Sequence, residues 1–184
     1  MSYTELQITT NFTFLRGGSH PEEMVNQALA LDYSDIAITD HNTLAGIVRA
    51  YTATKGKNIR IIPACRLNLL DGPSLLAYPT NKEAYSRLSG LLTIGNLRAE
   101  KGDCFLYKRD VFEHASGMKF IMVPPNSLNE FFDVEEEFKL ALKEYKHYLG
   151  NDLYLGAVRS YQANDNKKLF CFLFSRRTGK SFQR

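Results

Sequence analysis

The chain has 184 residues, of which 44% are hydrophobic and 23% are charged, as is typical of a soluble globular protein of one domain. Its net charge of +3 does not by itself indicate nucleic-acid binding. No apolar run approaches the ~20 residues of a membrane span, and the N-terminus lacks the features of a signal peptide. Three cysteines without a Cys-x-x-Cys pair indicate reduced thiols rather than a zinc knuckle. We therefore expect a cytoplasmic protein that makes no membrane contact.

Short strands alternate with helices in the first third of the chain. Apolar patterning predicts strands at 5–9, 35–39 and 59–64. Helical spacing predicts helices at 19–31 and 44–55. Ser19 and Glu22 fit a capping box at the first helix, and Gly56 follows the second as a C-terminal cap. This alternation predicts parallel strands joined by right-handed crossovers.

The pattern changes in the middle of the chain. Asp71-Gly72 is a strong turn signal, which predicts a hairpin of 65–70 with 74–78. Thr80 and Glu83 fit a second capping box, for a helix that runs to residue 92. Further elements are predicted as a strand at 105–107, a helix at 110–115, a strand at 119–123, a helix at 134–149 and a strand at 153–158. The fold class predicted from this order is α/β.

Polar residues gather where the predicted strands end, which is where α/β folds place functional groups. These ends are residues 9–11, 39–42, 64–66 and 123–126. Asp40-His41 is the strongest local signal, because a carboxylate and an imidazole can bind a metal or exchange a proton. The alternative is that both hydrogen-bond a strand-to-helix turn, which Asn42 or Thr43 would cap. The other histidines lie in predicted helices and are poor partners for a metal site: His20, His114 and His147.

Three other segments carry weaker signals. Arg16 and the following Gly17-Gly18-Ser19 precede a helix, whose N-terminus could hold an anion. Residues 178–181 contain Gly-Lys-Ser but lack the first glycine and the helix of a Walker loop, so we attribute this match to chance. The basic end of the chain is either a nucleic-acid-binding arm or a solvated tail, and we favour the tail. Its basic residues are Arg176, Arg177, Lys180 and Arg184.

Four segments resemble the start of bacterial error-prone DNA polymerases, which belong to the DNA polymerase III alpha subunit family. They are Phe14-Leu15-Arg16-Gly17-Gly18-Ser19-His20 within 3–23, Ile38-Thr39-Asp40-His41-Asn42 within 37–46, Asp71-Gly72-Pro73-Ser74 within 71–80, and Gly95-Asn96-Leu97-Arg98 within 95–102. The resemblance covers roughly residues 3–169. It implies the N-terminal PHP (polymerase and histidinol phosphatase) domain, a distorted seven-stranded β/α barrel, which agrees with the alternation of strands and helices.

Active members of the PHP superfamily hold a metal cluster, and the resemblance shows which ligand positions have changed in this chain. A first-strand His-x-His appears here as Gln7 and Thr9, and the acidic residue that follows appears as Arg16. A Glu after the third strand appears as Arg66, and a later His as Pro124. The Asp-His pair is kept as Asp40-His41, and no closing Asp-x-His motif is found.

These replacements remove the chemistry of a metal site. Gln and Thr are weak ligands compared with imidazole, and two arginines would place positive charge where cations should lie. Since buried guanidinium groups need carboxylate partners, we expect Arg16 or Arg66 to lie within ion-pair reach of Asp40. We therefore interpret the site as a former metal centre rebuilt as an internal network, with no catalytic residue, no bound metal and no cofactor.

The resemblance also implies how the chain is organised. Residues 1–169 would form a partial PHP barrel, incomplete at its C-terminal end, and 170–184 a divergent basic tail. A β/α barrel usually takes ~200–250 residues, so we expect a truncated or frame-shifted product. We expect it to be marginally stable, with residues 175–184 disordered and 170–174 covering an open sheet edge.

The family consists of DNA-directed DNA polymerases, which are nucleotidyltransferases of replication and damage-tolerant synthesis. Because the family's transfer carboxylates lie beyond residue 184, the function expected of this chain is a non-catalytic, structural one. Its partners would be the rest of the polymerase or other replication and repair proteins, and it would meet DNA only through the full-length polymerase. The alternatives are a metal-dependent phosphoesterase or 3′–5′ exonuclease, and a DNA-binding module.

Overall fold

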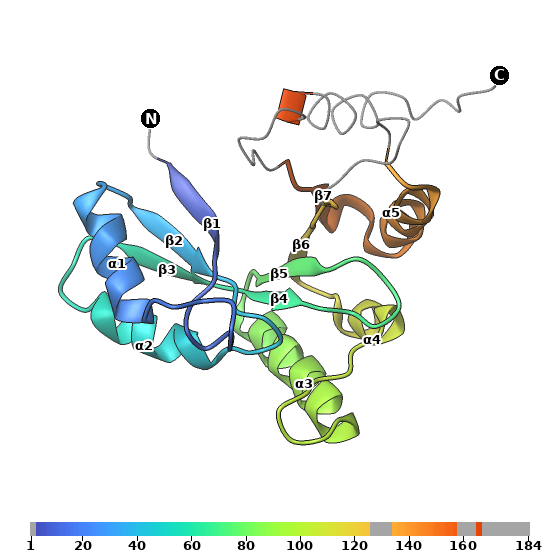
Figure 1. Cartoon of the computed structure of the whole chain (residues 1–184), viewed down its shortest axis with the longest axis horizontal. Helices are drawn as coiled ribbons and strands as arrows, with labels where there is room; N and C mark the ends of the chain where they lie inside the picture. Colours follow the sequence, from blue (N-terminus) through green and yellow to red (C-terminus); the bar gives the residue numbers. More distant parts are fainter. Residues whose placement is uncertain (1–2, 126–133, 158–164, 167–184) are drawn as a thin grey trace.

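The first third of the chain forms a parallel three-stranded sheet with two helices on one face (Figure 1). The structure is a computed structural model that describes residues 3–125, 134–157 and 165–166. The strands are β1 (Thr4–Ile8), β2 (Asp35–Ile38) and β3 (Arg60–Pro63), in the order β1-β2-β3. The helices are α1 (Pro21–Ala30) and α2 (Ala45–Ala53). The parallel pairing of all three strands confirms the crossovers predicted from the alternation.

The packing of this three-stranded sheet and its helices follows from the periodicity of their apolar residues. Val25 and Ala28 lie one turn apart on α1, and Ile47 and Ala50 do the same on α2, so each helix presents one buried stripe. These stripes cover Ile36 and Ile38 of β2. The residue between them, Ala37, is also fully buried but belongs to a different cluster on the other face. β2 is therefore buried on both faces, as is usual for a central parallel strand.

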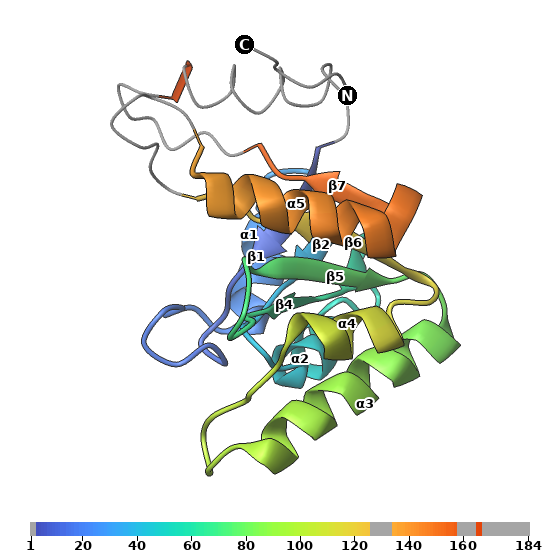
Figure 2. The same ribbon diagram turned by 90° about the vertical axis from the view of Figure 1, so that its right-hand side faces the viewer.

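The rest of the described chain forms a mixed four-stranded sheet. Its strands are β4 (Cys65–Leu67), β5 (Leu75–Pro79), β6 (Met118–Met122) and β7 (Leu153–Leu155), in that order across the sheet. β4 and β5 pair antiparallel around Asp71-Gly72, which confirms the predicted hairpin, and β6 pairs antiparallel with β5 but parallel with β7. Figure 2 shows the associated helices: α3 (Lys82–Arg98), α4 (Lys108–His114) and α5 (Glu136–Leu149). A short 3-10 turn, η1 (Gly150–Asp152), leads from α5 into β7.

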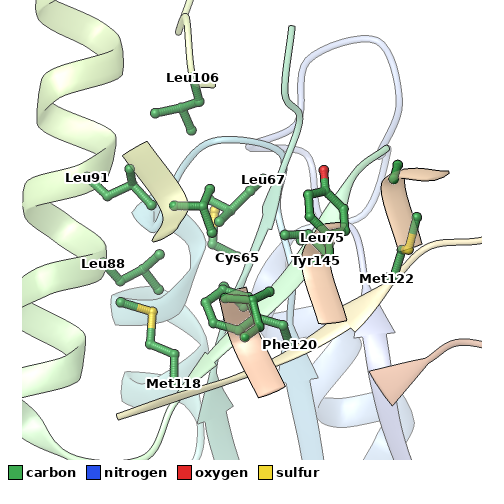
Figure 3. Close-up of a cluster of buried hydrophobic side chains, with 14 of the residues drawn as sticks. Cys65, Leu67, Leu75, Leu88, Leu91, Leu106, Met118, Phe120, Met122 and Tyr145 are labelled. Atoms are coloured by element: carbon green, nitrogen blue, oxygen red, sulfur yellow. The ribbon is translucent and has the colours of Figure 1, made fainter. Parts of the chain in front are cut away.

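The largest core lies between this sheet and its helices (Figure 3). Alternate residues of the strands point into it, among them Leu75 of β5 and Phe120 of β6. Leu88 and Leu91 of α3 pack on them, as does Tyr145 of α5, which is fully buried. The Tyr145 hydroxyl donates to the carbonyl of Pro73 at 2.9 Å, so the polar end of this ring is satisfied inside the core.

The opposite faces of the two sheets meet in a smaller inner core. Ala37 of β2, Ala64 after β3 and Leu76 of β5 form it together with Tyr78. The Tyr78 hydroxyl donates to the carbonyl of Leu6 in β1 at 2.7 Å and so links the sheets. Helices outside and an apolar layer inside are the layers of a β/α barrel. The fold class is therefore confirmed, although the two sheets do not close into a barrel within the described residues.

Several predicted boundaries move by one residue or more. His20, not Ser19, precedes α1, and its backbone N–H donates to Glu23 at 2.7 Å. Asn81, not Thr80, caps α3, which runs on to Arg98. The predicted strand at 105–107 is only an isolated bridge between Leu106 and Leu69.

Some predictions fall on parts of the chain that the structure does not describe. The predicted strand at 153–158 pairs over Leu153–Leu155, and residue 158 lies outside the described residues. The predicted edge cover at 170–174 and the basic tail up to residue 184 also lie outside them. None of the helices in the described part of the chain is both long enough and apolar enough to cross a membrane.

Candidate functional site

An open cleft of about 940 Å³ lies at the edge of the sheets where the parallel strands end. Gln7 comes from the end of β1 and Pro124 follows β6, while Arg66 lies in β4 and Arg16 in the loop after β1. Four of the five predicted ligand-replacement positions therefore line one cleft. The fifth, Thr9, follows β1 directly and is not part of the lining.

The opposite wall of the cleft is acidic and belongs mainly to α5. Glu135, Glu137 and Glu144 lie along this wall, and Asp71 of the hairpin turn joins them. Lys108 is the basic residue on this side: its Nζ lies 2.6 Å from Glu144, and its backbone N–H donates to Asp71 at 2.8 Å. The charge of Lys108 is thus already balanced within the wall.

Asp40 lies beneath the loop that follows β1 and is only 1% exposed. Its Oδ1 accepts hydrogen bonds from the backbone N–H of Thr10 at 2.7 Å and from the hydroxyl of Thr13 at 2.8 Å. Its Oδ2 accepts from the hydroxyl of Thr10 at 2.7 Å. On the helix side, a Cβ added at Gly46 would lie 2.5 Å from Oδ2. The first turn of α2 therefore abuts the carboxylate, and its dipole favours the negative charge there.

The prediction that Asp40 forms an ion pair with an arginine is wrong. Within the described residues, neither Arg16 nor Arg66 forms a salt bridge with Asp40, whose partners are Thr10 and Thr13. The reason is the alternation of side chains along a strand. His41 and Arg66 are parallel bridge partners, so their side chains leave the same face, whereas the neighbouring Asp40 leaves the other.

His41 is half-buried on the inner side, close to the two arginines. Burial lowers its pKa to about 4, and the charges of Arg66 and Arg16 contribute in the same direction. The ring is therefore neutral near pH 7. Its Nδ1 accepts a hydrogen bond from the side-chain amide of Asn68 at 2.9 Å, and the amide oxygen of Asn68 accepts from Ser74 at 3.0 Å. The side chains of Asp40 and His41 thus have different partners, although the backbone N–H of His41 donates to the Thr13 hydroxyl at 3.0 Å. The turn itself is held by Thr43, whose hydroxyl accepts from the N–H of Ala45 at 3.2 Å.

Sequence comparison identifies the family of the chain. The sequence profile of the PHP domain matches residues 5–160. The chain belongs to the PHP domain family. Its relatives include an error-prone DNA polymerase from Caulobacter vibrioides, 48% identical over 168 residues, and error-prone DNA polymerase 3 from Agrobacterium fabrum, 39% identical over 170 residues. These alignments cover 91% and 92% of this chain but 15% of each relative.

Solved structures with the same fold as this PHP domain are far more distant in sequence. A structure named as a metal-dependent phosphoesterase from Bifidobacterium adolescentis matches with a TM-score of 0.67 at 13% identity. An amidohydrolase from Chromobacterium violaceum, with bound sulfate and no metal, matches with a TM-score of 0.64 at 12% identity. Each match covers 96% of this chain and 84% of the other. At such identities the likeness establishes the fold alone.

The residues of this PHP domain do not fit a metal cluster. The part of the chain that the structure describes contains no group of three or more His, Cys, Asp or Glu side chains that could hold an ion. Both oxygens of Asp40 already accept hydrogen bonds, and Nδ1 of His41 is bonded to Asn68. Two guanidinium groups face the cleft instead.

The sequence interpretation missed the residues that now hold the site together. Thr10 and Thr13 are fully or almost fully buried and carry the Asp40 network. Asn68 joins His41 to the hairpin. The sequence did indicate Thr10, because it lies in the polar strand end at residues 9–11. Nothing in the local sequence of Thr13 or Asn68 distinguishes them from ordinary loop residues, because these partners lie 26 or 27 positions away.

Proposed function

We propose that this PHP domain is a non-hydrolytic domain of an error-prone DNA polymerase, in which it supports the polymerase and contacts partner proteins during DNA replication and translesion repair. The observation that carries the proposal is the pair of arginines in the cleft, at positions where the family's metal ligands would converge. The partners are the rest of the polymerase chain or other replication and repair proteins. Contact with DNA is made through the full-length polymerase, in the cytoplasm.

The names of the relatives support the polymerase assignment. Both relatives described above are named error-prone DNA polymerases, and this chain spans about 15% of their length. A chimera tests the assignment directly: the matching segment of the Caulobacter vibrioides polymerase is replaced by this chain. We expect the chimera to extend a primer like the parent polymerase, whereas deletion of the segment should yield an unstable or inactive protein. A folded chimera without polymerase activity would contradict the proposal.

The competing function is metal-dependent phosphoester hydrolysis, which the fold shared with the Bifidobacterium adolescentis phosphoesterase favours. Elemental analysis after incubation with Zn²⁺ or Mn²⁺, followed by dialysis, separates the two functions. So does a hydrolysis assay on an activated phosphodiester and on the 3′ end of DNA. We expect no stoichiometric metal and no hydrolysis. Stoichiometric metal together with hydrolysis that Asp40→Asn abolishes would establish the phosphoesterase instead.

A further inference from the structure

Within the described residues, the side chain of Arg66 has no partner. Its Nε is completely shielded from solvent and makes no hydrogen bond. No salt bridge to its guanidinium group is found within the described residues. Buried polar groups are almost always hydrogen-bonded, and one that is not costs free energy. This arginine therefore calls for a partner that the described residues do not supply.

Arg16 makes the same cleft more positive. Its side chain is exposed and lines the cleft with Arg66, and its charge contributes, after burial, to lowering the pKa of Arg66. The same two charges lower the pKa of His41. Asp40 does not offset this positive charge, because it is held on the other face by Thr10 and Thr13. Within the described residues, no carboxylate of the cleft forms a salt bridge with either arginine. Two like charges in one recess are unfavourable, and an anion between them would relieve the repulsion.

We propose that Arg16 and Arg66 form an oxyanion site that binds the terminal phosphate of a phosphate monoester without a metal ion. Guanidinium groups match phosphate oxygens by forked hydrogen bonds. A phosphate monoester carries a charge of about −1.5 to −2 at pH 7, which two arginines balance. The proposal rests on the non-hydrolytic function proposed above, because a metal cluster would occupy the same recess.

The far wall of the cleft selects a small anion over a DNA backbone. Three glutamates and Asp71 line that wall, and the one lysine there is already paired with Glu144. A polyanion passing through the cleft would face this wall, and the repulsion would oppose binding. Internal phosphodiesters also carry one charge where the two arginines offer two. The ligand is therefore a terminal phosphate, either on a small molecule or on the 5′ end of a nucleic acid.

Isothermal titration of the full chain in EDTA tests the site, at a constant ionic strength of ~0.15 M. The probes are inorganic phosphate and a short single-stranded DNA with either a 5′-phosphate or a 5′-hydroxyl. The variants are Arg66→Gln and Arg16→Gln. The control is Arg60→Gln, which removes the same charge from a side chain that is 75% exposed and paired with Asp35 at 2.5 Å, and which does not line the cleft. Far-UV circular dichroism checks the fold of each variant.

We expect phosphate to bind the wild type and Arg60→Gln alike, and Arg66→Gln at least about tenfold more weakly, because charge-assisted hydrogen bonds are lost. Without phosphate, Arg66→Gln should melt at the same temperature as the wild type or higher, because it removes an unpaired charge. Tighter binding of the 5′-phosphorylated DNA than of the 5′-hydroxyl DNA assigns the site to nucleic-acid ends; equal binding assigns it to small phosphates.

Two results would overturn the inference. The first is phosphate binding that is absent, or that is equal in wild type and a folded Arg66→Gln variant. The second is Arg66-dependent binding of the 5′-hydroxyl DNA without binding of phosphate. Phosphate binding that appears only when Zn²⁺ or Mn²⁺ replaces EDTA would overturn both this inference and the non-hydrolytic function. Absence of both phosphate and metal binding would overturn the inference alone.

Discussion

Replacing Asp40 by alanine should strongly destabilise the domain, because this carboxylate connects three separate elements. It accepts one backbone and two hydroxyl hydrogen bonds from Thr10 and Thr13, and it abuts the first turn of α2 at Gly46. Asp40→Ala would leave all three donors without their acceptor in a region where Thr10 is 0% and Thr13 5% exposed. The variant therefore tests whether the network holds the end of the sheet together.

The magnitude follows from the number of donors. Each buried donor left without an acceptor costs about 1–3 kcal/mol. The hydroxyls can rotate toward other acceptors, and the loss of a buried charge is favourable. The predicted loss of unfolding free energy for Asp40→Ala therefore lies near the lower limit, at about 3–4 kcal/mol. Asp40→Asn keeps an oxygen for the two bonds made at Oδ1 and should cost about 1–2 kcal/mol.

Urea unfolding followed by far-UV circular dichroism measures both changes through the shift of the midpoint, because the chain contains no Trp to report by fluorescence. Thr13→Val provides a double-mutant cycle with Asp40→Ala, for which we expect a coupling of about 1 kcal/mol. A cost below about 1 kcal/mol for Asp40→Ala, the value of an exposed polar contact, would refute the reasoning. Equal costs for the alanine and asparagine variants would show that hydrogen bonding at Oδ1 does not matter.

Three further substitutions test other parts of the fold by the same unfolding assay. Gly46→Ala should lower the unfolding free energy by about 1–3 kcal/mol in spite of the better helix propensity of alanine, because the added Cβ would lie 2.5 Å from Oδ2 of Asp40; a stabilised variant would contradict this contact. Tyr78→Phe should cost about 1 kcal/mol by removing the 2.7 Å hydrogen bond that links the sheets, and an unchanged midpoint would argue against that link. Asp110→Asn should cost about 1 kcal/mol, since Arg98 donates to Asp110 at 2.5 and 2.9 Å but is 42% exposed. The hydrogen bond with Arg98 lowers the pKa of Asp110, so the stabilisation is present above the ordinary pKa of 3.8 and is lost as the pH falls through the folded value; a difference between wild type and variant that does not shrink as the pH falls below 3.8 would contradict this assignment.

The order of the elements was predictable because it depends on local periodicity and turn chemistry. Parallel pairing followed from strand–helix alternation, and the hairpin followed from Asp71-Gly72. The start of α1 was displaced by one residue because Ser19 with Glu22 and His20 with Glu23 fit the same spacing. Pro21 decides between them: proline is favoured at the first helical position, so His20 becomes the cap.

The composition of the cleft was also predictable, because residues that follow parallel strands meet at one edge of the sheet. Gln7, Arg16, Arg66 and Pro124 do meet there. The partner of Asp40 was not predictable from residue type. An arginine is the better electrostatic partner in general. Which side chains share a face depends, however, on the isolated bridge between His41, which follows β2, and Arg66 of β4, and this bridge is formed only in the tertiary structure.

The same bridge explains why the arginine side of the cleft is positive although the domain keeps its aspartate. Asp40 lies on the helix side, where buried hydroxyls and the first turn of α2 surround it. Arg66 lies on the inner side, where Nε finds no acceptor. Turning Arg66 to the face of Asp40 would shift β4 by one residue and turn Cys65 and Leu67 out of the large core. The negative charge of Asp40 is thus held within the scaffold, whereas the positive charges of Arg16 and Arg66 face the cleft. This side of the cleft is therefore suited to binding an anion and unsuited to binding a metal ion.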